Sequence, residues 1–144
     1  MPRLTASPRN VRRLGALGAV ACIALGLGLQ LLDRSPILDV LGSILYVVLV
    51  GLLVLLVRPT IPEFVVASVA FAIATAIELL QLTGIPDSIG AVVPLAPLVL
   101  GSAFDPIDLV AYVGGAVLLF LLLHVITRLT RDVPTSGVAD ESIR

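Results

Sequence analysis

Long apolar runs, each about the length of one membrane crossing, alternate along the chain with short polar breaks. Four such runs are present, at residues 14–32, 37–57, 64–82 and 107–127, and none holds more than one charged residue. An α-helix needs about 20 predominantly apolar residues to cross the hydrocarbon core of a bilayer. The pattern therefore predicts an all-α integral membrane protein whose four transmembrane helices form one membrane domain over residues 14–127.

The breaks between the runs are not alike. Residues 33–36 form a short polar turn, and two prolines end the second run within residues 58–62, because proline cannot continue a helix. Residues 83–106 are mostly apolar but are interrupted repeatedly by Gly and Pro. Irregular backbone is not tolerated in contact with lipid. We therefore expect a short Pro-interrupted helix or a re-entrant segment here, packed against the bundle as a loop between the third and fourth spans.

Composition agrees with a lipid environment. Hydrophobic residues make up 58 % of the 144 residues and charged residues only 13 %, where about 25 % is usual, and the mean hydropathy is +1.14. A soluble domain of this size cannot bury so much apolar surface. The composition excludes a disordered chain, argues against a soluble enzyme, and makes the bilayer the first expected partner.

The arginines predict the orientation in the membrane. All nine basic residues are Arg, and with the N-terminus inside, Arg34 alone falls outside. Such a bias favours this topology, with residues 1–13 as an Arg-rich cytoplasmic tail, 128–144 as a disordered cytoplasmic tail, and 83–106 outside. Richness in Ala, Val and Leu with Arg and no Lys is typical of a GC-rich bacterial genome. The expected location is the plasma membrane of a bacterium. No basic stripe interleaved with aromatic residues suggests a nucleic-acid partner.

Polar residues gather at the predicted outer ends of three spans. Ionisable groups inside a membrane are costly and are functional candidates by default. Ala70 and Ala74 precede Glu78 on one face of the third span, and small residues allow close helix packing, so Glu78 should face the bundle. We expect a protonated Glu78 that donates to a neighbour in a polar or ligand-binding cluster. The candidates are Asp39 and Tyr46 on the second span, Glu78 and Gln81 on the third, and Asp108 and Tyr112 on the fourth.

The expected donation runs from Glu78 to Gln81 or Asp108, with the Tyr112 hydroxyl closing the network. Structural roles compete with this hypothesis. Asp39 and Asp108 also suit carboxylates that satisfy free N–H groups at helix N-termini, and Glu78 suits a residue that holds helices together.

Two charged or titratable residues belong to the predicted inner end. Glu63 is expected to cap the third span, and His124 to be a membrane-interface residue away from the polar cluster.

Catalytic signatures are absent from the sequence. It contains no His-Glu-x-x-His, no Cys-x-x-Cys, no glycine-rich phosphate loop and no serine-nucleophile elbow. We therefore predict no cofactor, no metal and no catalytic residue, and favour a protein without enzymatic activity.

Three motifs follow one another in the second half of the chain. An acid and a Gln end one span at residues 78–81, a Leu-Gly-x-x-Phe loop covers 100–104, and Asp-Leu-x-x-Tyr-x-x-Gly opens the next span at 108–115. Over about residues 37–120, this order and spacing resembles the bacterial family called domain of unknown function 2809 (DUF2809). The resemblance implies a small four-span membrane protein. A more distant resemblance is to VanZ-like proteins, in which an Asn stands where this chain has Tyr112.

Three functions are compatible with these features. The first is an envelope-related module that binds or modulates a lipid or lipid-linked ligand at the outer leaflet through the polar cluster. The second is a small proton-coupled carrier, acting as a homo-oligomer, with Glu78 as its proton site. The third is an intramembrane hydrolase in which Glu78 activates water.

Overall fold

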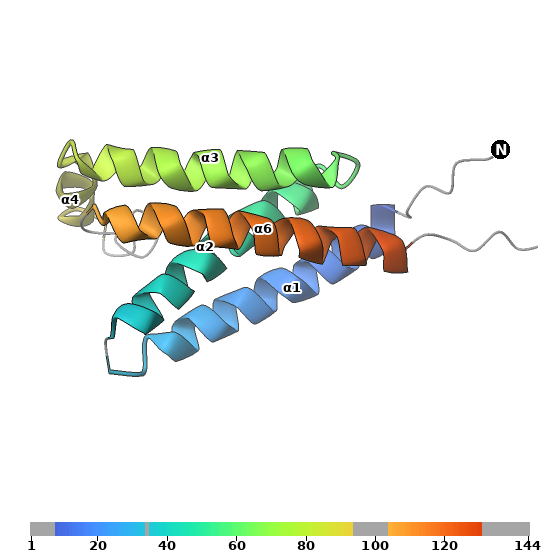
Figure 1. The fold of residues 1–144 in the computed structure, drawn as a ribbon, viewed down its shortest axis with the longest axis horizontal. Coiled ribbons are helices and arrows are strands. Elements are labelled where there is room, and N and C mark those ends of the chain that lie inside the picture. The colour runs from blue at the N-terminus through green and yellow to red at the C-terminus, as the bar shows by residue number, and fades with distance from the viewer. Residues whose placement is uncertain (1–7, 34, 94–103, 131–144) are drawn as a thin grey trace, which may run out of the picture.

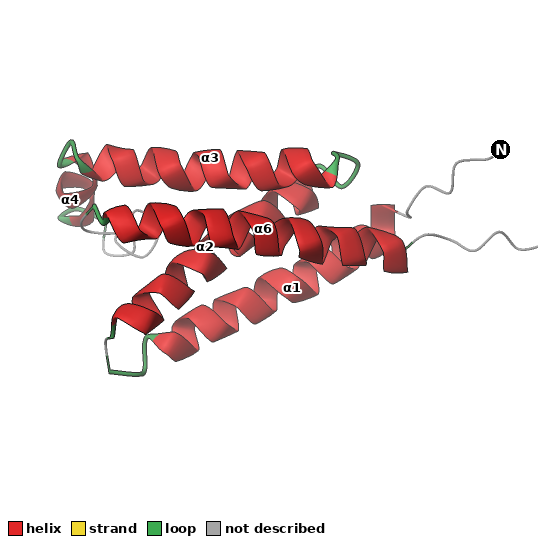
Figure 2. Ribbon diagram, in the orientation of Figure 1, coloured by secondary structure: helices red, strands yellow, loops and turns green. Residues whose placement is uncertain are grey.

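The computed structural model describes residues 8–33, 35–93 and 104–130, and every regular element in them is a helix (Figure 2). Four helices are long enough and apolar enough to cross a membrane, with 19 to 24 residues each. At a rise of about 1.5 Å per residue these helices match a hydrocarbon core of about 30 Å. The elements, labelled in Figure 1, are α1 (Pro8–Leu29), α2 (Pro36–Val57), α3 (Glu63–Gln81), α4 (Ile85–Gly90) and α6 (Pro106–Leu129).

The four-span architecture predicted from the apolar runs is confirmed in its helices. The first helix differs at its start, because α1 begins at Pro8 and not at the beginning of the apolar run. Proline is well suited to a first helical position, and Val11 in the next turn is only 1 % exposed. Arg9, Arg12 and Arg13 therefore belong to a helix.

The helices do not contribute equally to the bundle. α2 and α6 pack on each other, α3 packs on both, and α1 packs mainly on α2. Figure 1 shows α3 and α6 side by side, with α2 crossing α6 at an angle. The four largest fully buried side chains come from α2 and α6. They are Leu52, Leu55, Leu119 and Leu123.

Small residues line the helix contacts. Ala70 and Ala74 are 0 % exposed and Glu78 is 1 % exposed, which confirms that this face of α3 is turned toward the bundle. On α2, a Cβ added to Gly51 would lie 2.0 Å from Leu119 Cδ2. On α6, a Cβ added to Gly115 would lie 3.0 Å from the backbone oxygen of Ile44. Lipid provides no hydrophobic force between helices, so such close packing has to hold the bundle together.

The connections lie at two opposite ends of the bundle. We call the end with Glu78 and the start of α6 the outer end, and the end with the α2–α3 connection the inner end, after the predicted topology. α4 lies at the outer end beside the end of α3 (Figure 1). It falls within the predicted outer loop, where a short helix was expected; residues 94–103 of that loop, like the tails at 1–7 and 131–144, lie outside the described residues.

Thiol labelling in intact cells tests the predicted orientation. Thr60 and Ser88 are both exposed and lie at opposite ends of the bundle, and replacing Cys22, the one cysteine, by Ser gives a background for single cysteines. We expect a membrane-impermeant reagent to label Ser88→Cys and to spare Thr60→Cys until the cells are permeabilised. If Thr60→Cys alone were labelled in intact cells, the topology would be the inverse of the predicted one.

Candidate functional site

Glu78 is the most deeply buried carboxyl group described at the outer end. It lies in the last turns of α3, and its side chain is enclosed between α3 and the start of α6. Its Oε1 accepts a hydrogen bond from the backbone N–H of Asp105 at 2.6 Å, and its Oε2 accepts one from the Tyr112 hydroxyl at 3.0 Å. The N-terminus of a helix carries a partial positive charge. The carboxyl group is thus placed where a negative charge is favoured.

This arrangement corrects the expected hydrogen bonding of Glu78. We expected the carboxyl to donate to Gln81 or Asp108, whereas its two described partners are the N–H of Asp105 and the hydroxyl of Tyr112. The expected protonation of Glu78 stays a prediction. The expected contact between Glu78 and Tyr112 is present, with Tyr112 as the donor.

The start of α6 explains why Asp105 takes part. Asp105 is the N-cap, with extended backbone angles, and its Oδ1 accepts the N–H of Ile107 at 2.9 Å. Pro106 follows at the first helical position, a preferred N-terminal sequence. The capping role considered for Asp108 therefore belongs to Asp105. Sequence reasoning missed Asp105 as a site residue, although the Asp-Pro pair is a recognisable signal for a helix start.

Asp108 links α6 to α2 and not to Glu78. Its Oδ1 accepts a hydrogen bond of 2.6 Å from the Ser43 hydroxyl, which also contacts the backbone oxygen of Asp39 at 3.1 Å. Ser43 stands one turn after Asp39 and was not among the predicted site residues. The i, i+4 spacing of Asp39 and Ser43 was the available signal, since it places both on one helix face.

The remaining predicted residues lie around these two contacts. Asp39 is exposed in the first turn of α2, where Ser35 and not Asp39 is the N-cap. Tyr46 is half-buried against the core, and Gln81 is half-buried in the last turn of α3. Among the described residues, the contact of Glu78 with Asp105 and Tyr112 is thus separate from the contact of Asp108 with Ser43.

The charge at the outer end has one sign in the part of the chain that the structure describes. The acidic side chains there are those of Asp33, Asp39, Glu78, Asp105 and Asp108, and Arg34, the basic residue predicted on this side, lies outside the described residues. Carboxylates are hydrogen-bond acceptors. The end therefore suits a ligand that brings hydrogen-bond donors or positive charge. Within the same ranges, no group of three or more His, Cys, Asp or Glu side chains is arranged to hold a metal ion.

A second polar contact between α3 and α6 lies at the inner end. The Glu63 carboxylate accepts a hydrogen bond from the Thr127 hydroxyl and lies 3.1 Å from His124 Nδ1. Arg128 Nε donates to His124 Nε2 at 2.8 Å, which assigns the ring proton to Nδ1 and makes it the donor to Glu63. The expected cap at Glu63 is wrong, because the N-cap is Pro62 and no side chain caps α3. His124 does lie apart from the outer cluster, as expected.

His124→Phe tests the contribution of this inner contact. Phenylalanine keeps an aromatic ring beside Phe120, whose ring centroid lies 6.2 Å from that of His124, but it removes both ring nitrogens. We expect the free energy of unfolding to fall by about 1 kcal/mol, measured by steric trapping in detergent. An unchanged stability would mean that the inner contact contributes nothing measurable.

Comparison with known proteins identifies the family. The family model described as protein of unknown function (DUF2809) matches residues 32–116, and the chain belongs to this family. The matched segment includes every predicted site residue, leaves out all of α1 and ends within α6. No curated protein and no solved structure matches the chain. The VanZ-like resemblance stays a prediction.

Proposed function

For this member of the DUF2809 family, we propose a non-catalytic role in the bacterial envelope: binding, at the outer end, of a lipid or lipid-linked molecule whose headgroup carries an ammonium group. The observation that carries the proposal is the Asp108 carboxylate, which Ser43 holds at 2.6 Å beside the exposed Asp39 and Asp105. An ammonium group donates three hydrogen bonds and carries the opposite charge. Bonds of this kind are stronger than neutral ones.

The surroundings of Asp108 favour a lipid over a water-soluble amine. Ile37 and Val110 are each 73 % exposed, and Ile107 is 58 % exposed. Asp108 and its acidic neighbours are therefore bordered by aliphatic side chains at the end of membrane-spanning helices. A headgroup at Asp108 leaves its acyl chains beside this apolar border, where burial of apolar area adds to binding.

The two alternative functions both depend on Glu78. A hydrolase needs water at the Glu78 carboxyl, which is 1 % exposed and is held by two donors. A proton carrier needs this carboxyl to be released and reloaded, and transporters are commonly built from paired repeats. The bonding of Glu78 favours a positioning role, in which it fixes the start of α6 and so the place of Asp108.

Asp108→Asn tests the proposal with little change in shape. The Asn side-chain oxygen still accepts from Ser43, so the contact between α2 and α6 is kept while the charge is removed. The measurement is native mass spectrometry of protein released from nanodiscs that contain phosphatidylethanolamine and phosphatidylcholine in equal amounts. We expect wild type to retain phosphatidylethanolamine preferentially, and Asp108→Asn to retain it about tenfold more weakly.

Asp33→Asn is the matched control, because it removes the same charge from the same end and Asp33 lies in the loop before α2. It should retain the lipid as wild type does. Equal retention of both lipids by wild type, or an equal loss in the two variants, would contradict the proposal. Proton flux through proteoliposomes that disappears in Glu78→Gln would instead favour the carrier.

A further inference from the structure

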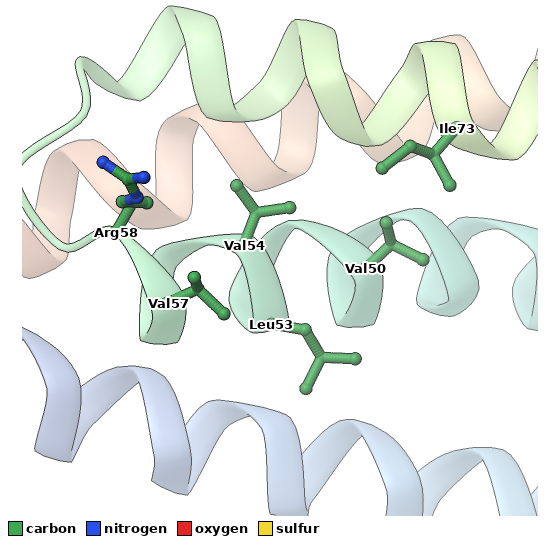
Figure 3. Close-up of a pocket in the computed structure, with 6 residues that line it drawn as sticks. All are labelled: Val50, Leu53, Val54, Val57, Arg58 and Ile73. Atoms are coloured by element: carbon green, nitrogen blue, oxygen red, sulfur yellow. The ribbon is translucent and has the colours of Figure 1, made fainter.

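A shallow apolar groove runs along α2 on the inner half of the bundle. α1 and α3 both pack on α2 but, in the ranges described, not on each other, so one side of α2 stays uncovered between them. The groove is lined by Val50, Leu53, Val54 and Val57 of α2 and by Ile73 of α3, with Arg58 at its inner end (Figure 3). Leu53 and Val57 are 48 % and 70 % exposed, so the groove is open to the surrounding lipid.

The groove has the length of part of an acyl chain. From residue 50 to residue 57 the helix rises by about 10 Å, and half of a typical hydrocarbon core is about 15 Å thick. An acyl chain that starts at the level of Arg58 therefore lies in the groove over most of the thickness of one leaflet.

Arg58 lies at the inner mouth of the groove, and two further arginines lie at the same depth. Added Cβ atoms on Gly15 and Gly18 of α1 would lie 3.1 Å from Leu55 and 3.2 Å from Leu52. α1 and α2 run in opposite directions, so this register brings Arg12 and Arg13 to the depth of Arg58. All three are exposed. Glu63, the acidic residue described at this end, is engaged by α6 through Thr127 and His124. The mouth therefore holds the basic Arg58, with Arg12 and Arg13 at the same level of the membrane.

We propose that an anionic phospholipid docks in this groove, with one acyl chain along α2 and its phosphate on the Arg58 guanidinium. Cytoplasmic leaflets are rich in anionic lipids, and basic residues near the membrane surface attract them. A planar guanidinium matches the phosphate oxygens with two parallel donors. A second copy of the chain suits the groove less well, because a symmetric pair across it with both chains in the same orientation brings two Arg58 side chains to the same depth.

Competition between two lipid classes tests this site in the full-length protein. Nanodiscs contain phosphatidylglycerol and phosphatidylcholine in equal amounts, and native mass spectrometry counts the lipids retained after release. Wild type is expected to retain phosphatidylglycerol preferentially, and Arg58→Gln to retain it about fivefold more weakly. Arg9→Gln removes the same charge from the same end, about one helical turn farther from the centre of the bilayer. This variant should behave as wild type.

Val57→Phe tests the apolar part of the groove. Val57 is largely exposed, so the larger ring narrows the groove without disturbing the core, and phosphatidylglycerol retention should fall while Arg58 is unchanged. Equal losses of phosphatidylglycerol retention in Arg58→Gln and Arg9→Gln would indicate a general attraction to the basic surface instead of a specific site. The proposal would be overturned if neither Arg58→Gln nor Val57→Phe lowered the retention of phosphatidylglycerol. It would also be overturned if the protein left the nanodiscs as a dimer free of lipid.

Discussion

Glu78→Leu should destabilise the protein by about 2–4 kcal/mol, because it leaves two hydrogen-bond donors without their acceptor. One is the N–H of Asp105 at the start of α6, and the other is the hydroxyl of Tyr112, which is 5 % exposed. The Tyr112 hydroxyl is buried and has little access to water that could replace the lost bond, whereas Asp105 is an exposed residue. The free energy of unfolding, measured by steric trapping in detergent micelles, gives the loss directly.

Glu78→Gln and Tyr112→Phe complete this experiment. Gln keeps one side-chain oxygen as an acceptor, so it should lose less stability than Leu. Tyr112→Phe removes one donor together with its bond, and Glu78→Leu in that background should then cost less than in wild type. Strictly additive losses would show that Glu78 and Tyr112 do not interact. A Glu78→Leu protein as stable as wild type would make the contact incidental.

Gly51→Ala should also destabilise the bundle, by about 1–3 kcal/mol. The added methyl group would fall 2.0 Å from Leu119 Cδ2 and 3.0 Å from its Cγ. Leu119 is 0 % exposed, so its side chain has no free space to turn into, and α2 and α6 have to move apart.

Gly42→Ala is the matched control on the same helix, since an added Cβ there meets nothing within 4 Å. It should leave stability unchanged or raise it slightly, because Ala is the better helix former. Reducing Leu119 to Val in the Gly51→Ala background should recover part of the loss. An equal effect of the two glycine substitutions would mean that helix propensity, and not packing, decides the outcome.

The four membrane spans could be predicted from the sequence, because lipid imposes a simple requirement on the composition and length of a helix. Apolar runs of about 20 residues have few alternatives to a membrane helix, and the buried face of α3 could be read from Ala70, Ala74 and Glu78. The first turns of α1 could not, since Arg9 to Arg13 look like a polar tail until Val11 is known to pack in the core.

The polar contacts were harder to predict because depth alone does not choose partners. Asp108 and Glu78 were predicted at the same depth. They lie on different faces of their helices, however, and Asp108 contacts Ser43 on α2 instead of Glu78. The same holds for Glu63, whose partners His124 and Thr127 are more than 60 residues away in the chain. Helix register across such separations comes from packing, and the sequence pattern of a single helix does not contain it.

The interhelical side-chain hydrogen bonds of the described residues share one property that bears on synthesis. Each has one partner on α6 or at its N-cap: Asp105 and Tyr112 for Glu78, Asp108 for Ser43, and His124 and Thr127 for Glu63. α6 is the last of these helices to leave the ribosome. Until it inserts, Ser43, Glu63 and Glu78 wait in the membrane without these partners, and its arrival closes both ends of the bundle in one event. A nascent chain that stops before α6 therefore lacks every one of these hydrogen bonds.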